Sequence, residues 1–269
     1  MDSELLYVFG VGNATATNLY NTCFALRNHD EYFMTDAGGG NGILKILDHM
    51  QIPIPKIRHL FVTHAHADHI LGMIWMIRTI AEQILNEVYE GDAQIYCHEE
   101  LAETLKTLCR LTMQKKYFNV IGDRIHLNVV KDGDTRHILS YDVTFFDIHS
   151  EKEKQFGYTL ILNNGKKLTF TGDEPYNPVC EKYVADSDWL LHEAFCLYSE
   201  RDIWKPEERH HCTVKDACET AQALQIPNLV LWHTDDSNIA GRQRLYKSEG
   251  SRYYGGNLCI PDDESLIAL

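Results

Sequence analysis

Six consecutive residues, His64-Ala65-His66-Ala67-Asp68-His69, directly follow the β-rich stretch His59-Leu60-Phe61-Val62-Thr63. The apolar stretch predicts a strand, and the residues from Ile70 onward predict a helix. The chain must therefore place four side chains with ligand-type nitrogen or oxygen atoms at one strand-to-helix turn. Alternate residues of an extended segment point to the same side, so we expect His64 and His66 to face one point.

Strand and helix patterns alternate along the rest of the chain, which is typical of an α/β fold. The predicted strands cover residues 20–26, 32–35, 59–63, 93–97, 125–130, 143–148, 157–162, 167–170, 189–191 and 228–232. The predicted helices cover residues 43–50, 70–89, 98–116 and 213–224. Thr213, followed by Asp216 three residues later, predicts a capped start for the last helix.

Several polar side chains stand at or just past the C-terminal end of a predicted strand. They are His64, His149, Asp173, His192 and His233. Because α/β architectures place their chemistry at the rims of sheets, we expect these strand ends to deliver their side chains to a shared rim.

The cluster has the residue types that a dinuclear metal site needs. Such a site holds two cations roughly 3.5–4 Å apart and leaves a position open for the attacking water. Imidazole and carboxylate ligands favour Zn²⁺, and Mn²⁺ or Fe²⁺ also fits this ligand type. The competing interpretation is a plain surface run of histidines, and four ligand-type residues within six positions argue against it.

The cluster also carries a family resemblance. It resembles the H-x-H-x-D-H signature of metallo-β-lactamase-fold hydrolases. Further segments resemble that family's later motifs in the same order: residues 146–149, 170–173, 191–194, 211–214 and 229–233. Residues 191–194 and 211–214 resemble the H-E-A-T and H-S-T segments of the ribonuclease Z branch. The resemblance implies a four-layer αβ/βα sandwich and one hydrolase domain over residues 1–269.

The resemblance further implies a ligand set. One metal would take His64, His66 and His149, the second would take Asp68, His69 and His233, and Asp173 would bridge them. It also implies that His211 and Glu193 help to protonate the leaving oxygen, and that Asp68 orients or deprotonates the attacking water.

Each of these residues also has an ordinary structural interpretation. His149 could be a strand-end histidine, Asp173 could cap a turn before Pro175, and His233 could bind Asp235 or Asp236. His210 stands beside His211, and either ring could face the site. Glu193 could be a structural acceptor for His211, and Asp36, in a glycine-rich segment, could hold a ligand histidine.

The ligand set predicts hydrolysis, and the ribonuclease Z-like segments favour a small phosphodiester or related anionic ester. Histidine at position 66 argues against the redox branch of the fold, which resembles this chain but has glutamate there. The chain could instead be a ribonuclease Z-like RNA-processing nuclease, although residues 150–172 leave no room for the long basic arm of those enzymes. It could also hydrolyse lactones or thioesters, or be a non-catalytic metal-stabilised binding or scaffold module.

Composition limits the partners. The chain has 269 residues and a formal net charge of −14, which disfavours binding to nucleic acid by broad electrostatics. Eight scattered cysteines and no signal peptide lead us to expect reduced thiols and a cytoplasmic location. The longest apolar stretch is too short for a membrane span. The family resemblance suggests a homodimer.

Overall fold

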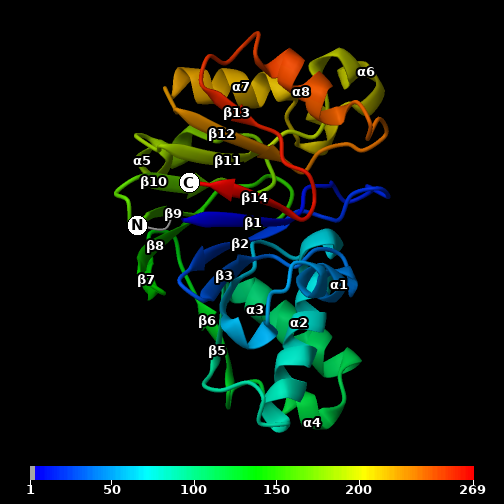
Figure 1. The fold of residues 1–269 in the computed structure, drawn as a ribbon, viewed down its shortest axis with the longest axis vertical. Helices are drawn as coiled ribbons and strands as arrows, with labels where there is room; N and C mark the ends of the chain where they lie inside the picture. The colour runs from blue at the N-terminus through cyan, green and yellow to red at the C-terminus, as the bar shows by residue number, and fades with distance from the viewer. Residues whose placement is uncertain (1–3) are drawn as a thin grey trace. The chain divides into compact units, whose positions relative to one another are not determined.

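The computed structural model describes residues 4–269 and divides into two compact units. Of the described residues, unit 1 comprises 4–10, 20–131 and 264–269, and unit 2 comprises 11–19 and 132–263. Each unit contains one seven-stranded sheet (Figure 1). That residues 1–269 behave as a single domain stays a prediction.

Unit 1 is built on a mixed sheet in the order β14-β1-β2-β3-β4-β5-β6. Its strands are β1 (Leu5–Gly10), β2 (Cys23–Asn28), β3 (Glu31–Thr35), β4 (Ile57–Phe61), β5 (Ala93–Cys97), β6 (Ile125–Val129) and β14 (Ser265–Ala268). Strands β3 to β6 run parallel, while β14, β1 and β2 pair antiparallel. The helices are α1 (Gly42–His49), α2 (Ala67–Leu85), α3 (Glu99–Thr112) and α4 (Lys115–Phe118).

Helix α2 forms because its apolar residues recur at helical spacing and pack into the core of unit 1. Ile70, Met73, Ile77 and Ile80 are fully or almost fully buried in that core. Gly72 lets the helix approach a neighbouring loop, because a Cβ there would lie 1.8 Å from the Ala37 carbonyl oxygen. This close approach holds the start of α2 against the loop after β3.

Unit 2 is built on a second mixed sheet, in the order β13-β12-β11-β10-β9-β8-β7. Its strands are β7 (Thr135–Ile138), β8 (Tyr141–Asp147), β9 (Phe156–Ile161), β10 (Lys167–Phe170), β11 (Trp189–Glu193), β12 (Asn228–Trp232) and β13 (Asn257–Cys259). Strands β10 to β13 run parallel, and β7, β8 and β9 pair antiparallel. The helices are α5 (Glu181–Val184), α6 (Arg201–Trp204), α7 (Val214–Ala223) and α8 (Arg242–Gly250).

The loop at residues 11–19 belongs to unit 2 although the strands around it in sequence belong to unit 1. Thr234 N donates to the Val11 carbonyl at 2.9 Å, and Asn13 N donates to the Thr234 carbonyl at 3.1 Å. The Asp236 carboxylate accepts the backbone amides of residues 17, 18 and 19. A single buried carboxylate thus fixes the turn of this loop.

The structure corrects several predicted boundaries. Helix α2 starts three residues earlier than predicted, because the backbone is extended only as far as His66, the residue before the first turn. The helix predicted over residues 98–116 breaks at Met113, whose backbone is extended. Strands β1, β7, β13 and β14 and helix α8 were not predicted. Helix α8 lacks an apolar stripe because its inward face carries Arg242, a buried side chain that binds the Asp262 carboxylate at 2.6 Å.

The eight cysteines form no disulfide. No helix within residues 4–269 combines the length and hydropathy that a bilayer crossing requires.

Candidate metal centre

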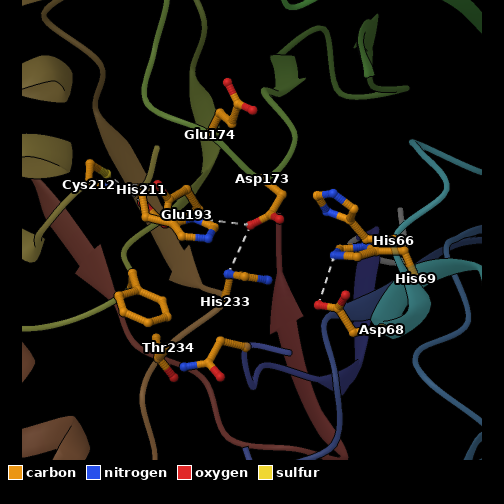
Figure 2. A network of polar contacts seen from close by, with 12 residues as sticks. His66, Asp68, His69, Asp173, Glu174, Glu193, His211, Cys212, His233 and Thr234 are labelled. Atoms are coloured by element: carbon orange, nitrogen blue, oxygen red, sulfur yellow. Dashed lines mark hydrogen bonds and ion pairs between the residues drawn. The ribbon is translucent and has the colours of Figure 1, made fainter. Parts of the chain in front are cut away.

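The first group of candidate ligands lies in unit 1, between the end of β4 and the first turn of α2. His64 and His69 are fully or almost fully buried, Asp68 is buried and His66 is half-buried. His64 Nε2 and His66 Nδ1 are 2.8 Å apart, and the His64 and His69 ring centroids are 4.3 Å apart. The Asp68 carboxylate lies 3.4 Å from His69 Nε2, a pair joined by a dashed line in Figure 2.

Asp36, which follows β3, positions this group through hydrogen bonds to Thr63 and His69. Its carboxylate accepts the Thr63 backbone amide at 2.9 Å and the Thr63 hydroxyl at 2.8 Å. The same carboxylate binds His69 Nδ1 at 2.8 Å, and the Thr63 hydroxyl contacts His64 Nδ1 at 2.8 Å. These contacts assign the protons to both Nδ1 atoms and leave both Nε2 atoms available as ligands. The predicted role of Asp36 in holding a histidine is confirmed.

His69 shows why this place suits a cation. Burial alone lowers the pKa of its imidazole, but the charges of Asp68 and Asp36 outweigh burial and raise that pKa well above its ordinary value. A buried ring between two carboxylates therefore stands in a strongly negative environment. The same negative charges would stabilise a divalent cation bound at His69 Nε2.

The second group lies in unit 2, at the C-terminal ends of three adjacent parallel strands. Asp173 follows β10, Glu193 ends β11 and His233 follows β12. All three side chains are buried. Parallel strands end at the same edge of a sheet, so residues 20 to 60 positions apart in sequence converge here.

The distances within this second group fit a cation. One ligand atom from each of its four members, Asp173, Glu193, His211 and His233, lies within 4.8 Å of the others. His233 Nδ1 is 2.8 Å and His211 Nδ1 is 3.7 Å from Asp173 Oδ1 (Figure 2). Buried imidazole nitrogens and carboxylate oxygens are the donors that Zn²⁺ and related divalent ions bind, so the residues present fit such a metal.

The structure distinguishes between the two neighbouring histidines. The His211 ring stacks between Phe195, at 4.9 Å between centroids, and His233, at 5.1 Å. His210 is exposed, has a left-handed backbone and pairs with Glu151 at 3.3 Å. His211 is thus the ring that faces the cluster in unit 2.

Glu193 binds the segment that carries His211. One of its oxygens accepts the Cys212 backbone amide at 2.6 Å, and the other lies 3.6 Å from His211 Nδ1. The carboxylate therefore holds the backbone directly after His211 and lies close to its ring. His192 faces elsewhere: its Nδ1 contacts the Glu193 carbonyl at 2.7 Å, and burial lowers its pKa. His192 is therefore not part of the unit 2 group, although it stands at a strand end.

Two residues depart from the sequence analysis. His149 is exposed after β8, its backbone is left-handed, and its amide donates to Asp147 at 2.8 Å. It is not part of the unit 2 group, and its ligand role stays a prediction. Lys152 was missed: its Nζ lies 3.3 Å from His211 Nε2. No motif marked it, because it stands in the charged run Glu151-Lys152-Glu153-Lys154.

A cavity of about 530 Å³ opens beside His211 in unit 2. Ile148, Tyr176 and Pro178 contribute to its apolar wall, and His210 and Glu207 contribute polar groups. This volume lies within the range of sites that bind small molecules.

Comparisons with known proteins define the class. The structure of the metallo-β-lactamase-fold protein YhfI from Bacillus subtilis matches at a TM-score of 0.81 and 15% identity, over 99% of each chain. A diphosphatase from the PhnP family matches at a TM-score of 0.74 and 14% identity, over 99% of this chain and 98% of that one. A Ribonuclease Z from Thermococcus sibiricus is 25% identical, over 99% of this chain and 96% of its own length.

The chain is accordingly a metal-dependent hydrolase of the metallo-β-lactamase fold, similar to the ribonuclease Z branch, as the sequence predicts. The family model described as anti-Pycsar protein Apyc1 matches residues 5–238, and the chain belongs to that family.

Proposed function

We propose that the chain hydrolyses small phosphodiesters or related anionic esters with two divalent metal ions, zinc being favoured. The observation that carries this proposal is the unit 2 group, in which His211 and Glu193 join the ligand-type residues Asp173 and His233 within 4.8 Å. A group that combines metal ligands with a separate histidine–glutamate pair is suited to activating water and protonating a leaving oxygen.

The assignment of ligands follows the family resemblance. His64, His66 and His149 would hold one ion, Asp68, His69 and His233 the other, and Asp173 would bridge them. When bound, such ions supply a nucleophile from water at neutral pH and positive charge that stabilises the transition state. Asp68 is proposed to orient the attacking water.

His211 is proposed as the proton donor to the leaving oxygen. Its Nδ1 faces the Asp173 and Glu193 carboxylates, so its Nε2 points to the opposite side of the ring. A proton held at Nε2 is the one available for transfer to a substrate. Glu193 keeps the ring in this direction through the Cys212 amide and its contact to Nδ1.

A small substrate is supported by the segment between His149 and Asp173. Strands β9 and β10 pair antiparallel and are joined by a tight turn in which Gly165 has a positive φ. These residues form a hairpin in place of a long basic arm. The net charge of −14 and the cavity beside His211 support a small substrate further.

RNA cleavage is a second candidate, because curated relatives are named Ribonuclease Z at 21–25% identity. Cleavage of a precursor transfer RNA with higher kcat/KM than small diesters would favour it. Lactone or thioester hydrolysis uses the same metal chemistry and belongs in the same substrate panel. A metal-bound protein that turns over no compound in the panel would support a binding module instead.

The test combines elemental analysis with a panel of linear and cyclic phosphodiesters, lactones and thioesters at fixed metal loading. His66→Ala is expected to remove most bound metal and all activity. His137→Ala is the matched control, because His137 is exposed and pairs with Asp142, also at the surface. Full activity in the His66 variant would refute the proposal. Light scattering tests the expected homodimer.

A further inference from the structure

Lys152 places an ammonium group among the acidic residues of unit 2. Its Nζ lies 4.0 Å from Asp173 Oδ2 and 3.9 Å from Glu174 Oε1. It donates a hydrogen bond to the Asp173 carbonyl at 3.4 Å, and its Nζ lies 3.3 Å from His211 Nε2. The side chain is only 16% exposed, so it is held against the cluster and does not extend into solvent.

A second buried carboxylate fixes the turn that carries Lys152. Glu174 accepts the Ser150 hydroxyl at 2.5 Å and the Glu151 backbone amide at 3.3 Å. The Ser150 oxygen in turn accepts the backbone amides of Lys152 and Glu153, each at 3.2 Å. The residue next to Asp173 in the chain therefore sets the position of the lysine backbone.

The same loop is tied down at its other end. The Gln155 side-chain oxygen accepts the Asp173 amide at 2.5 Å, and the Gln155 carbonyl accepts the Ile148 amide at 3.0 Å. Residues 150–155 thus form a turn that is held by hydrogen bonds at both ends, and this turn sets the position of Lys152. The bracing reduces the entropy that Lys152 loses on binding a ligand.

Lys152 has a weak acceptor in this structure. Within residues 4–269 its Nζ donates to the Asp173 carbonyl at 3.4 Å and lies beside His211 Nε2, while both carboxylates lie beyond hydrogen-bond distance. A phosphate oxygen is a stronger acceptor, because both partners would then be charged. Asp173, Glu174 and Glu193 place negative charge close to this position, and a nearby cation offsets their repulsion of an anion.

We infer that Lys152 binds a non-bridging oxygen of the substrate phosphate beside His211 and so selects phosphodiesters over neutral esters. This inference rests on the proposed function and extends it to substrate choice. Lys152 stands on the side of His211 Nε2, which is the nitrogen proposed to protonate the leaving oxygen. Lys152 would therefore contact a non-bridging oxygen of the phosphate group whose ester bond breaks.

The test compares Lys152→Met, Lys152→Arg and the control Lys154→Met, which removes the same charge from an exposed position two residues away. The substrates are bis(p-nitrophenyl) phosphate and p-nitrophenyl acetate, which share a leaving group and differ in charge. Lys152→Met should lower kcat/KM for the diester about 10- to 100-fold, as expected for a hydrogen bond between charged groups. The acetate should change less than about threefold, and Lys152→Arg should recover most of the loss.

A binding measurement separates this inference from the proposed function. Titration of the metal-loaded protein with inorganic phosphate should show weaker binding in Lys152→Met than in wild type, at equal metal content by elemental analysis. If wild type cleaves no diester, the proposed function fails, and phosphate binding alone decides the role of Lys152. Equal loss on both esters, loss of metal, or unchanged phosphate affinity would each overturn the inference.

Discussion

The two units share a strand pattern but gather their polar residues in different ways. Each sheet has three antiparallel strands followed by four parallel ones. In each, an aspartate follows the first parallel strand: Asp36 after β3 and Asp173 after β10. Unit 1 then takes its ligand-type residues from one continuous turn, residues 64–69. Unit 2 collects them from three strand ends and one loop.

The difference shows two routes to a charged site. In unit 1, neighbouring residues supply the donors and Asp36 only orients them. In unit 2, Asp173 is itself the central group, and His211 and His233 both face it. The first arrangement depends on local backbone geometry, and the second depends on the register of parallel strands.

The strongest test of this comparison is Asp173→Asn. Loss of the central carboxylate of unit 2 should remove bound metal and reduce activity to background, because the activation of water depends on the ions. Elemental analysis and diester hydrolysis measure both effects. Asp186→Asn, at an exposed position of the same unit, is the control. Full metal content in the Asp173 variant would mean that unit 1 holds the ions alone.

His211→Ala should have the next largest effect. We expect bound metal to stay, turnover of diesters with poor leaving groups to fall about 100-fold, and p-nitrophenyl diesters to change little. His137→Ala, at an exposed position of the same unit, is the control variant. Equal losses on both kinds of substrate would exclude proton donation by His211.

Asp36→Asn tests the orienting role in unit 1. Because Asp36 holds Thr63 and His69 without standing among the predicted ligands, metal affinity should weaken roughly 10- to 100-fold. Competition with a metal chelator gives the affinity. Asp142→Asn breaks a histidine–aspartate contact at the surface and should have no effect. Unchanged affinity in the Asp36 variant would show that local geometry alone suffices.

Thr213→Ala should have the smallest effect. Thr213 and Asp216 form a capping box at the start of α7, directly after His211 and Cys212, whereas α2 starts at His66 without a side-chain cap. Losing the cap should cost about 1 kcal/mol in the free energy of unfolding, measured in urea. Thr220→Ala, inside the same helix, serves as the reference. A loss no larger than in that variant would contradict the capping role.

The sequence patterns located the parallel strands more reliably than the edges of the sheets. Strands β5, β10 and β12 have the predicted bounds because they are short and every position but one in each is buried. The edge strands β13 and β14 contain three and four residues, too few for a period to show. Helix α8 was not predicted because its inward face carries a buried arginine, paired with Asp262, and shows no apolar stripe.

The sequence by itself predicted a cluster of ligand-type residues at 64–69 and determined the class of fold, because neighbouring residues at fixed spacing carry that information locally. Only the tertiary structure decided that His211 and not His210 faces the unit 2 cluster, that His149 is exposed, and that Lys152 reaches His211. Those outcomes depend on backbone turns and on contacts between distant segments. No pattern of neighbouring residues encodes where such segments meet.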